Sequence, residues 1–174
     1  MKWNKKFEYP ASVRSSIEGK RHYEITGQKL PSVTTILSAT QSPEKKAKLE
    51  EWKKRVGTQQ ADRIRDVSAM RGTAMHTYLE GYILGENHLD LTSIGREAER
   101  MANVVIEKGL GDLGEVWGSE VTLYYPGLYA GATDVVGLYS GKPAIIDFKQ
   151  TNKPKQREWI DDYFTQLAAY AMAH

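Results

Sequence analysis

The sequence of 174 residues contains no cysteine. Disulfide bonds and cysteine-ligated zinc sites are therefore excluded, and a reducing compartment is compatible with the chain. No apolar run approaches the roughly 20 residues of a membrane-spanning helix. The basic start, residues 1–6, is not followed by the apolar core of a signal peptide. These absences predict a cytoplasmic protein that does not insert into a membrane.

The net charge is only +2, but the basic residues are unevenly distributed. Between residues 44 and 71, nine Lys or Arg stand against five Asp or Glu, and residues 149–157 hold four basic residues and no acidic one. Such segments indicate a polyanionic partner. For any single charge, a solvated helix face is the more common explanation.

The most informative stretch is residues 131–150. Two apolar runs, 135–139 and 144–148, flank a Ser-Gly-Lys-Pro turn, which predicts a β-hairpin. Side chains alternate along a strand, so Asp147 and Lys149 share one face, and an antiparallel partner strand would bring Asp134 close to Asp147.

Two carboxylates beside one ammonium group form an oxygen site for a divalent cation. A cation bound there would lower the pKa of its water and neutralise a scissile phosphate. Lys149 would stabilise the attacking hydroxide or the developing negative charge. As an alternative, Asp-x-Lys is a short and common pattern, and these residues could be surface charges on an ordinary hairpin.

Within residues 59–84, the apolar period over residues 71–84 predicts a helix. His76 and Glu80 are four residues apart in it, which places them on one face of the helix. They would bring an imidazole and a carboxylate to the metal. A single histidine on a helix is more often structural than a ligand, but the preceding Arg71-Gly-Thr73 and the following Glu80 strengthen the metal-site interpretation.

The remaining elements are expected as follows. Residues 1–30 are an N-terminal arm, largely irregular with some strand, and residues 30–37 are either a short helix capped by Ser32 or a strand. Helices are predicted at 42–56, capped by Ser42, at 92–108, with Met101, Val104 and Val105 facing inward, and at 159–174. Residues 115–149 form a three-strand antiparallel meander. Glu120 is a strand carboxylate to which the sequence assigns no role.

Four motifs in this order carry a family resemblance. They are Arg71-Gly-Thr-x-x-His76-x-x-x-Glu80, Gly131-x-x-Asp134, Ile-Asp147-Phe-Lys149 and Gln166-x-x-x-Tyr170. Together they resemble the PD-(D/E)xK nuclease superfamily in its RecB-like branch, and within it the mitochondrial genome maintenance exonucleases and related phage exonucleases. If the gene belongs to a phage, the expected location is the cytoplasm of the host cell.

The resemblance implies an α/β fold with a restriction-endonuclease-like core, in which helices flank a central mixed sheet built on the meander. It implies Mg²⁺ or Mn²⁺ as cofactor, held by Asp134, Asp147, the backbone carbonyl of Phe148, and His76. Lys149 would position the attacking water, and Glu80 would bind a second metal or orient its water. DNA contacts are expected from Arg71, Thr73, Lys153, Lys155, Gln166 and Tyr170.

There are two local departures from the family pattern. Thr133 precedes Asp134 where proline is common, and Gln150 follows Lys149 where threonine is frequent. The family core also continues beyond the last helix. We therefore expect residues 1–174 to be one nuclease domain whose C-terminal part is missing, or is supplied by a second chain.

The expected function is a metal-dependent deoxyribonuclease, an exonuclease on single-stranded DNA or DNA ends. One alternative is a DNA-binding or assembly module of the same fold that does not cut. The other is an endonuclease, for which the sequence offers no separate recognition domain.

Overall fold

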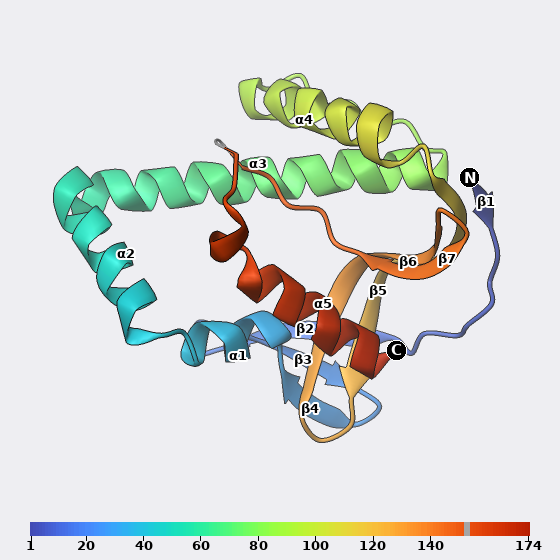
Figure 1. Ribbon diagram of the computed structural model, residues 1–174, viewed down its shortest axis with the longest axis horizontal. Helices are drawn as coiled ribbons and strands as arrows, with labels where there is room; N and C mark the ends of the chain where they lie inside the picture. Colours follow the sequence, from blue (N-terminus) through green and yellow to red (C-terminus); the bar gives the residue numbers. More distant parts are fainter. Residues whose placement is uncertain (152–153) are drawn as a thin grey trace. The chain divides into compact units, whose positions relative to one another are not determined.

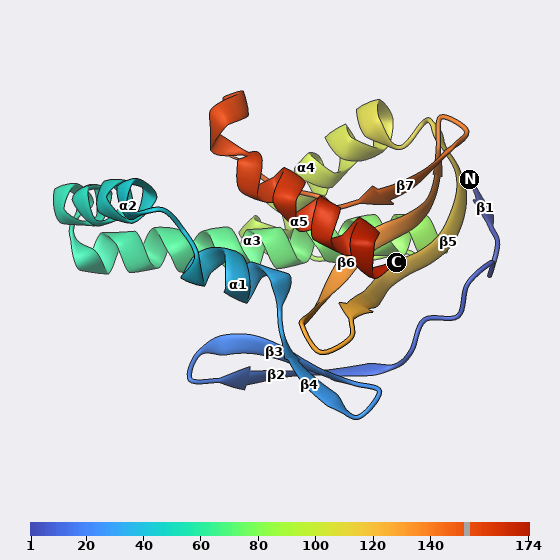
Figure 2. The ribbon, with the colours of Figure 1, turned by 60° about the horizontal axis from the view of Figure 1, so that its bottom comes forward.

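The structure is a computed structural model that describes residues 1–151 and 154–174. The chain forms two units, Met1–Ala39 with Leu110–His174, and Thr40–Gly109. Figures 1 and 2 show the ribbon coloured along the sequence. Within the two described ranges, no helix has both the length and the apolar character needed to cross a membrane.

A mixed sheet lies at the centre of the first unit. Its strand order is β1 (Lys2–Trp3), β5 (Leu113–Tyr125), β6 (Tyr129–Tyr139) and β7 (Lys142–Ile146). β1 runs parallel to β5, and the other neighbours are antiparallel. Gly127, at the turn between β5 and β6, has φ 75°, a conformation that glycine adopts without steric cost. The predicted meander and the mixed α/β class are confirmed, and both are compatible with a nuclease-like core.

A second, antiparallel sheet is formed by β2 (Ser12–Ile17), β3 (Lys20–Ile25) and β4 (Gln28–Pro31). Its buried side chains, Tyr23, Ile25 and Leu30, pack against Ala130 of β6. The expectation of a largely irregular N-terminal arm is therefore wrong for residues 12–31. Polar and charged residues separate the few buried ones in these short strands, so the sequence carries little apolar periodicity there.

α1 (Val33–Ala39) follows β4 directly. The Oγ of Ser32 accepts a hydrogen bond from the backbone N of Thr35 at 3.0 Å, which is the geometry of an N-cap. Of the two structures predicted for residues 30–37, the helix capped by Ser32 is confirmed.

α5 (Asp161–Ala173) lies along the mixed sheet, as the views in Figures 1 and 2 agree, and contacts β5, β6 and β7. It follows the short 3₁₀ helix η1 (Arg157–Trp159). Tyr170 of α5 is buried in a hydrophobic cluster of this unit, together with Val33, Trp117, Leu123 and Val136. Helices α1 and α5 are thus the layer that flanks the sheet in the first unit.

The second unit is helical, with α2 (Pro43–Val56), α3 (Thr58–Leu84) and α4 (Ser93–Gly109). Ser42 caps α2 by accepting from the backbone N of Lys45, and Gly85 ends α3 in a left-handed conformation. α4 buries Gly95, Ala98 and Ala102, while Val104 is 52% exposed. The expected inward face of this helix is therefore wrong at Val104, because α4 packs through its small residues.

Candidate active site

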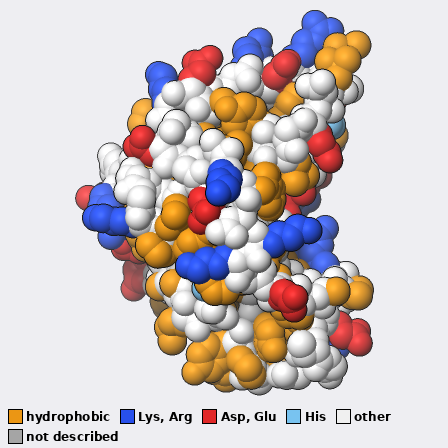
Figure 3. All heavy atoms as spheres, turned by 90° about the vertical axis from the view of Figure 1, so that its right-hand side faces the viewer, with side chains coloured by type: hydrophobic (Ala, Val, Ile, Leu, Met, Phe, Trp, Pro, Cys, Tyr) orange, Lys and Arg blue, Asp and Glu red, His pale blue; other side chains and the backbone are white. Residues whose placement is uncertain are grey.

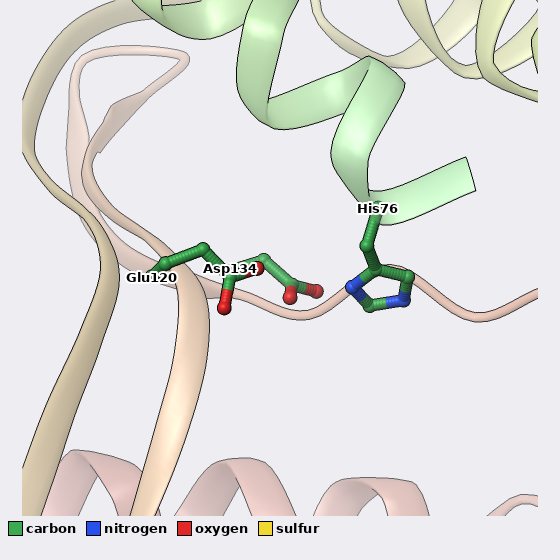
Figure 4. A group of neighbouring side chains, drawn as sticks. All are labelled: His76, Glu120 and Asp134. Carbon is green, nitrogen blue, oxygen red and sulfur yellow. The ribbon is translucent and has the colours of Figure 1, made fainter. Parts of the chain in front are cut away.

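Glu120 and Asp134 form a carboxylate pair across two neighbouring strands. The register pairs Ser119 with Val135 and Val121 with Thr133, so Glu120 stands opposite Asp134. Their carboxylate oxygens lie within 4.8 Å of each other, and Figure 4 shows both side chains as sticks. Two carboxylates at this separation are suitable ligands for a hard divalent cation.

The backbone at Glu120 is strained. Its φ is 51°, in the left-handed region that residues other than glycine rarely enter. Such conformations cost about 1–3 kcal/mol and are concentrated at functional sites. Glu120 is therefore a candidate site residue on two independent observations, its backbone and its distance from Asp134.

Asp134 is held by the chain segment that follows β7. Its Oδ2 accepts a hydrogen bond from the backbone N of Phe148, and the carboxylate is almost completely buried. The adjacent Thr133 donates from Oγ1 to the backbone O of Ile146 at 3.1 Å. A proline at position 133 would lack this hydroxyl, which gives the threonine a structural role beside the site.

The side chain of Asp147 is 8% exposed, and the side chains of Lys149 and Gln166 position it. Lys149 donates from Nζ to Asp147 Oδ2, and Gln166 Nε2 lies 3.5 Å from Asp147 Oδ1. Gln166 also donates to the hydroxyl oxygen of Tyr170 at 2.8 Å. The hairpin brings Asp134 and Asp147 to the same end of β6 and β7, as predicted, because Val135 pairs with Ile146.

Burial shifts two pKa values in this group. Desolvation lowers the pKa of Lys149 below its usual value, and the negative charge of Asp134 opposes the shift. Burial raises the pKa of Tyr170 to about 12. The phenol of Tyr170 is therefore neutral at physiological pH and keeps its hydroxyl for hydrogen bonding.

The predicted residues of the second unit lie on α3. His76 and Glu80 are half-buried, and Thr73 is exposed. His76 is the third side chain that Figure 4 labels. Arg71 is buried and donates from Nη1 to Glu97 Oε1 at 2.9 Å, so its guanidinium links α3 to α4. This packing role was not predicted, and the catalytic and DNA-binding roles of these α3 residues stay predictions.

Lys155 is exposed, and Lys153 lies outside the described residues. The residue that the sequence left without a role is Glu120. A signal for it existed: pairing residues outwards from the Pro126-Gly127 turn, with Tyr125 opposite Tyr129, leads to Glu120 opposite Asp134.

No family model matches the chain. Mitochondrial genome maintenance exonuclease 1 of Xenopus tropicalis is 28% identical over 177 residues, covering 95% of this chain and 48% of the relative. The protein of the same name from Mus musculus is 30% identical over 133 residues, covering 72% and 38%. The chain spans half or less of the length of the relatives it matches.

These comparisons do not support a second chain that completes the fold. The word mitochondrial belongs to the names of the relatives. The expected cytoplasmic location of this chain stays a prediction.

Proposed function

We propose that this protein is a metal-dependent deoxyribonuclease of the RecB-like branch of the PD-(D/E)xK superfamily, acting as an exonuclease on single-stranded DNA or DNA ends. The observation that carries the proposal is the geometry around the end of the β6–β7 hairpin. There, Asp134 accepts from the amide of Phe148, and Asp147 pairs with Lys149. The names of the two relatives support the same class of reaction.

The chain offers suitable ligands for Mg²⁺ or Mn²⁺. Glu120 and Asp134 would supply carboxylate oxygens, and the family resemblance adds Asp147, the carbonyl of Phe148, and His76. When bound, such a cation supplies an acidified water and neutralises phosphate charge. An imidazole nitrogen in the ligand set would favour Mn²⁺ more than an all-oxygen set does.

Lys149 is the residue that we assign to the attacking water and to the negative charge that develops on the phosphate. Asp147 holds its ammonium group, and partial burial lowers its pKa. A desolvated point charge interacts more strongly with a developing anion than one in bulk water. Gln166 contacts both Asp147 and Tyr170, so it would orient the carboxylate that holds Lys149.

The remaining predicted residues would act on the DNA strand or on a second metal. Glu80 is proposed for the second metal or its water. Arg71, Thr73, Lys153 and Lys155 are proposed to lie along the path of the DNA backbone. Binding through phosphates is independent of base sequence and weakens with salt.

End-labelled single- and double-stranded DNA, incubated with Mg²⁺ or Mn²⁺, tests this function. Asp147→Asn and Lys149→Met should each lower the cleavage rate by about 10²–10³-fold, the cost of losing one group that stabilises charge. Glu24→Gln on the exposed side of β3 removes one negative charge elsewhere in the same unit and should leave the rate unchanged. The position of the label in the products would give the polarity of digestion.

Metal binding offers a readout that does not depend on cleavage. Asp134→Asn and Glu120→Gln should weaken Mn²⁺ binding, followed by electron paramagnetic resonance, by at least about tenfold, since each removes a charged ligand. A parent protein that binds DNA but cuts no substrate with either metal would instead support the module that does not cut. A parent that neither binds nor cuts DNA would refute the proposal.

A further inference from the structure

The hairpin of β2 and β3 carries two arginines on one face, in the same unit as Asp134 and Asp147. Arg14 pairs with Tyr23, and Ser16 pairs with Arg21. Because side chains alternate along a strand, these four residues point to the same side of the sheet. A hollow at this place is lined by Arg14, Ser15, Ser16, Gly19 and Arg21.

The chemistry of this hollow fits an anion. None of its five lining residues is acidic, and both arginines are exposed. Arg14 and Arg21 are diagonal neighbours on adjacent strands, where like charges repel each other. An oxyanion between the two guanidinium groups would remove this repulsion and could accept paired hydrogen bonds from each fork.

Arg21 is also fixed in position by its backbone. Its carbonyl oxygen accepts hydrogen bonds from the backbone N of Ser32 and from Thr35 Oγ1, both at 3.0 Å. Ser32 is almost completely buried, and it caps α1. The arginine therefore projects from a braced point in the fold, which is the condition for precise binding.

Backbone pairing connects Arg21 to the strand that carries Asp134. The carbonyl oxygen of Arg21 accepts from Ser32, and Ser32 forms a parallel bridge with Ala130 of β6, four residues before Asp134. Burial raises the pKa of Tyr170. Tyr23 and Asp134 add to this increase, and the positive charge of Arg21 opposes it. Arg21 and Asp134 thus both act on one phenol, which in turn accepts from Gln166 beside Asp147. A strand with one phosphate at the carboxylates would therefore have a further phosphate available for Arg21.

We infer that Arg14 and Arg21 form a binding site for a backbone phosphate of the nucleic acid strand, separate from the phosphate at the carboxylates. The inference rests on the proposed nuclease function, to which it adds two residues for holding the substrate. On the face drawn in Figure 3, Lys and Arg side chains are mixed with acidic and hydrophobic ones. The distribution of charge on that face therefore does not indicate a path for the nucleic acid strand. The pair of arginines is a more specific indication of where a phosphate binds.

The test compares Arg14→Gln/Arg21→Gln with the matched control Lys20→Gln. Lys20 is the neighbour of Arg21 in the sequence and points to the opposite face of β3. A fluorescent single-stranded oligonucleotide is titrated in EDTA, so that binding is measured without cleavage. We expect the double variant to bind the oligonucleotide about tenfold more weakly. The plot of the logarithm of the association constant against the logarithm of the salt concentration should become less steep by about 0.7 for each phosphate contact that is lost. The loss should be equal for oligo-dT and for a mixed sequence.

A second assay separates failure of the arginine site from failure of the nuclease proposal. Hydrolysis of bis(4-nitrophenyl) phosphate with Mn²⁺ requires only one phosphate at the carboxylates, so the arginine variants should keep it, while Lys149→Met should lose it. If the parent cuts DNA and the double variant matches Lys20→Gln in affinity and salt slope, the arginine site is refuted and the nuclease stands. If the parent hydrolyses neither DNA nor the small diester but the arginine variants still lose oligonucleotide affinity, the nuclease proposal fails and the phosphate site remains.

The remaining controls concern folding and the source of the phosphate. Both arginines are exposed, so their variants should melt at the temperature of the parent. Arg21→Lys, which keeps the charge without the planar fork, should bind with intermediate affinity. Inorganic phosphate at millimolar concentration should not displace the oligonucleotide from the parent. If millimolar inorganic phosphate does displace it, the hollow binds free phosphate, and the assignment to a nucleic acid strand is wrong.

Discussion

Replacing Gly131 by alanine should disturb the site through one side chain. An added Cβ would lie 2.9 Å from the hydroxyl oxygen of Tyr170 and closer still to its ring carbon Cε1. The ring cannot easily give way, because Tyr170 is 3% exposed and accepts from Gln166. The new methyl group therefore overpacks a buried contact, which typically costs about 1–3 kcal/mol.

The matched control is Gly114→Ala in β5 of the same sheet, where the nearest atom to an added Cβ is the backbone O of Leu138 at 4.0 Å. Alanine gains about 0.5–1 kcal/mol over glycine within a strand by restricting the unfolded chain. Because this gain is common to both variants, the difference between them isolates the overpacking, again about 1–3 kcal/mol. Urea unfolding with an unchanged m value measures this difference.

A double-mutant cycle identifies the cause. In a Tyr170→Leu background the ring atoms that meet the new Cβ are absent, so Gly131→Ala should cost no more there than Gly114→Ala. DNA cleavage by Gly131→Ala should fall as well, because a displaced Tyr170 releases Gln166 from its position beside Asp147. The reasoning is refuted if Gly131→Ala is as stable as Gly114→Ala in the wild-type background, or if its cost persists in the Tyr170→Leu background.

Two further predictions concern the same region. Tyr170 has a folded pKa of about 12 against a usual value of 10.0, so its contribution to stability is complete below pH 10 and is lost as the pH rises from about 10 to about 12. The parent should lose about 2–3 kcal/mol over this range relative to Tyr170→Phe, as urea midpoints would show, and parallel curves for the two proteins would contradict the assignment. Thr133→Val removes the fully buried donor to the backbone O of Ile146 and should cost about 1–2 kcal/mol of unfolding free energy. Cleavage should also fall, whereas Thr133→Ser keeps the hydroxyl and should retain activity. Unchanged stability and cleavage in Thr133→Val would show that this hydrogen bond does not support the site.

The elements that the sequence predicted correctly depend on local physics. Ser42 caps α2 as predicted, and Gly85 ends α3, because these signals act within one helical turn. The hairpin of β6 and β7 follows from two apolar runs around a turn. Its register then brings Asp134 and Asp147 together by counting along the chain.

Two predictions were wrong because the structure there depends on packing between elements. Val104 was expected inside and is 52% exposed, because α4 packs through Gly95, Ala98 and Ala102. The strands β2 to β4 were expected to be largely irregular. Their alternation is recognisable only once Tyr23, Ile25 and Leu30 have Ala130 to pack against.

The sequence by itself determined the types of chemical group at the candidate site and the order of the elements that carry them. Only the tertiary structure decided that Arg71 pairs with Glu97, that Tyr170 requires a glycine at 131, and that Arg21 is braced by Ser32 and Thr35. The reason is physical. Turns, caps and periodicity arise from interactions over a few residues, whereas these three contacts depend on how strands and helices distant in the chain pack together.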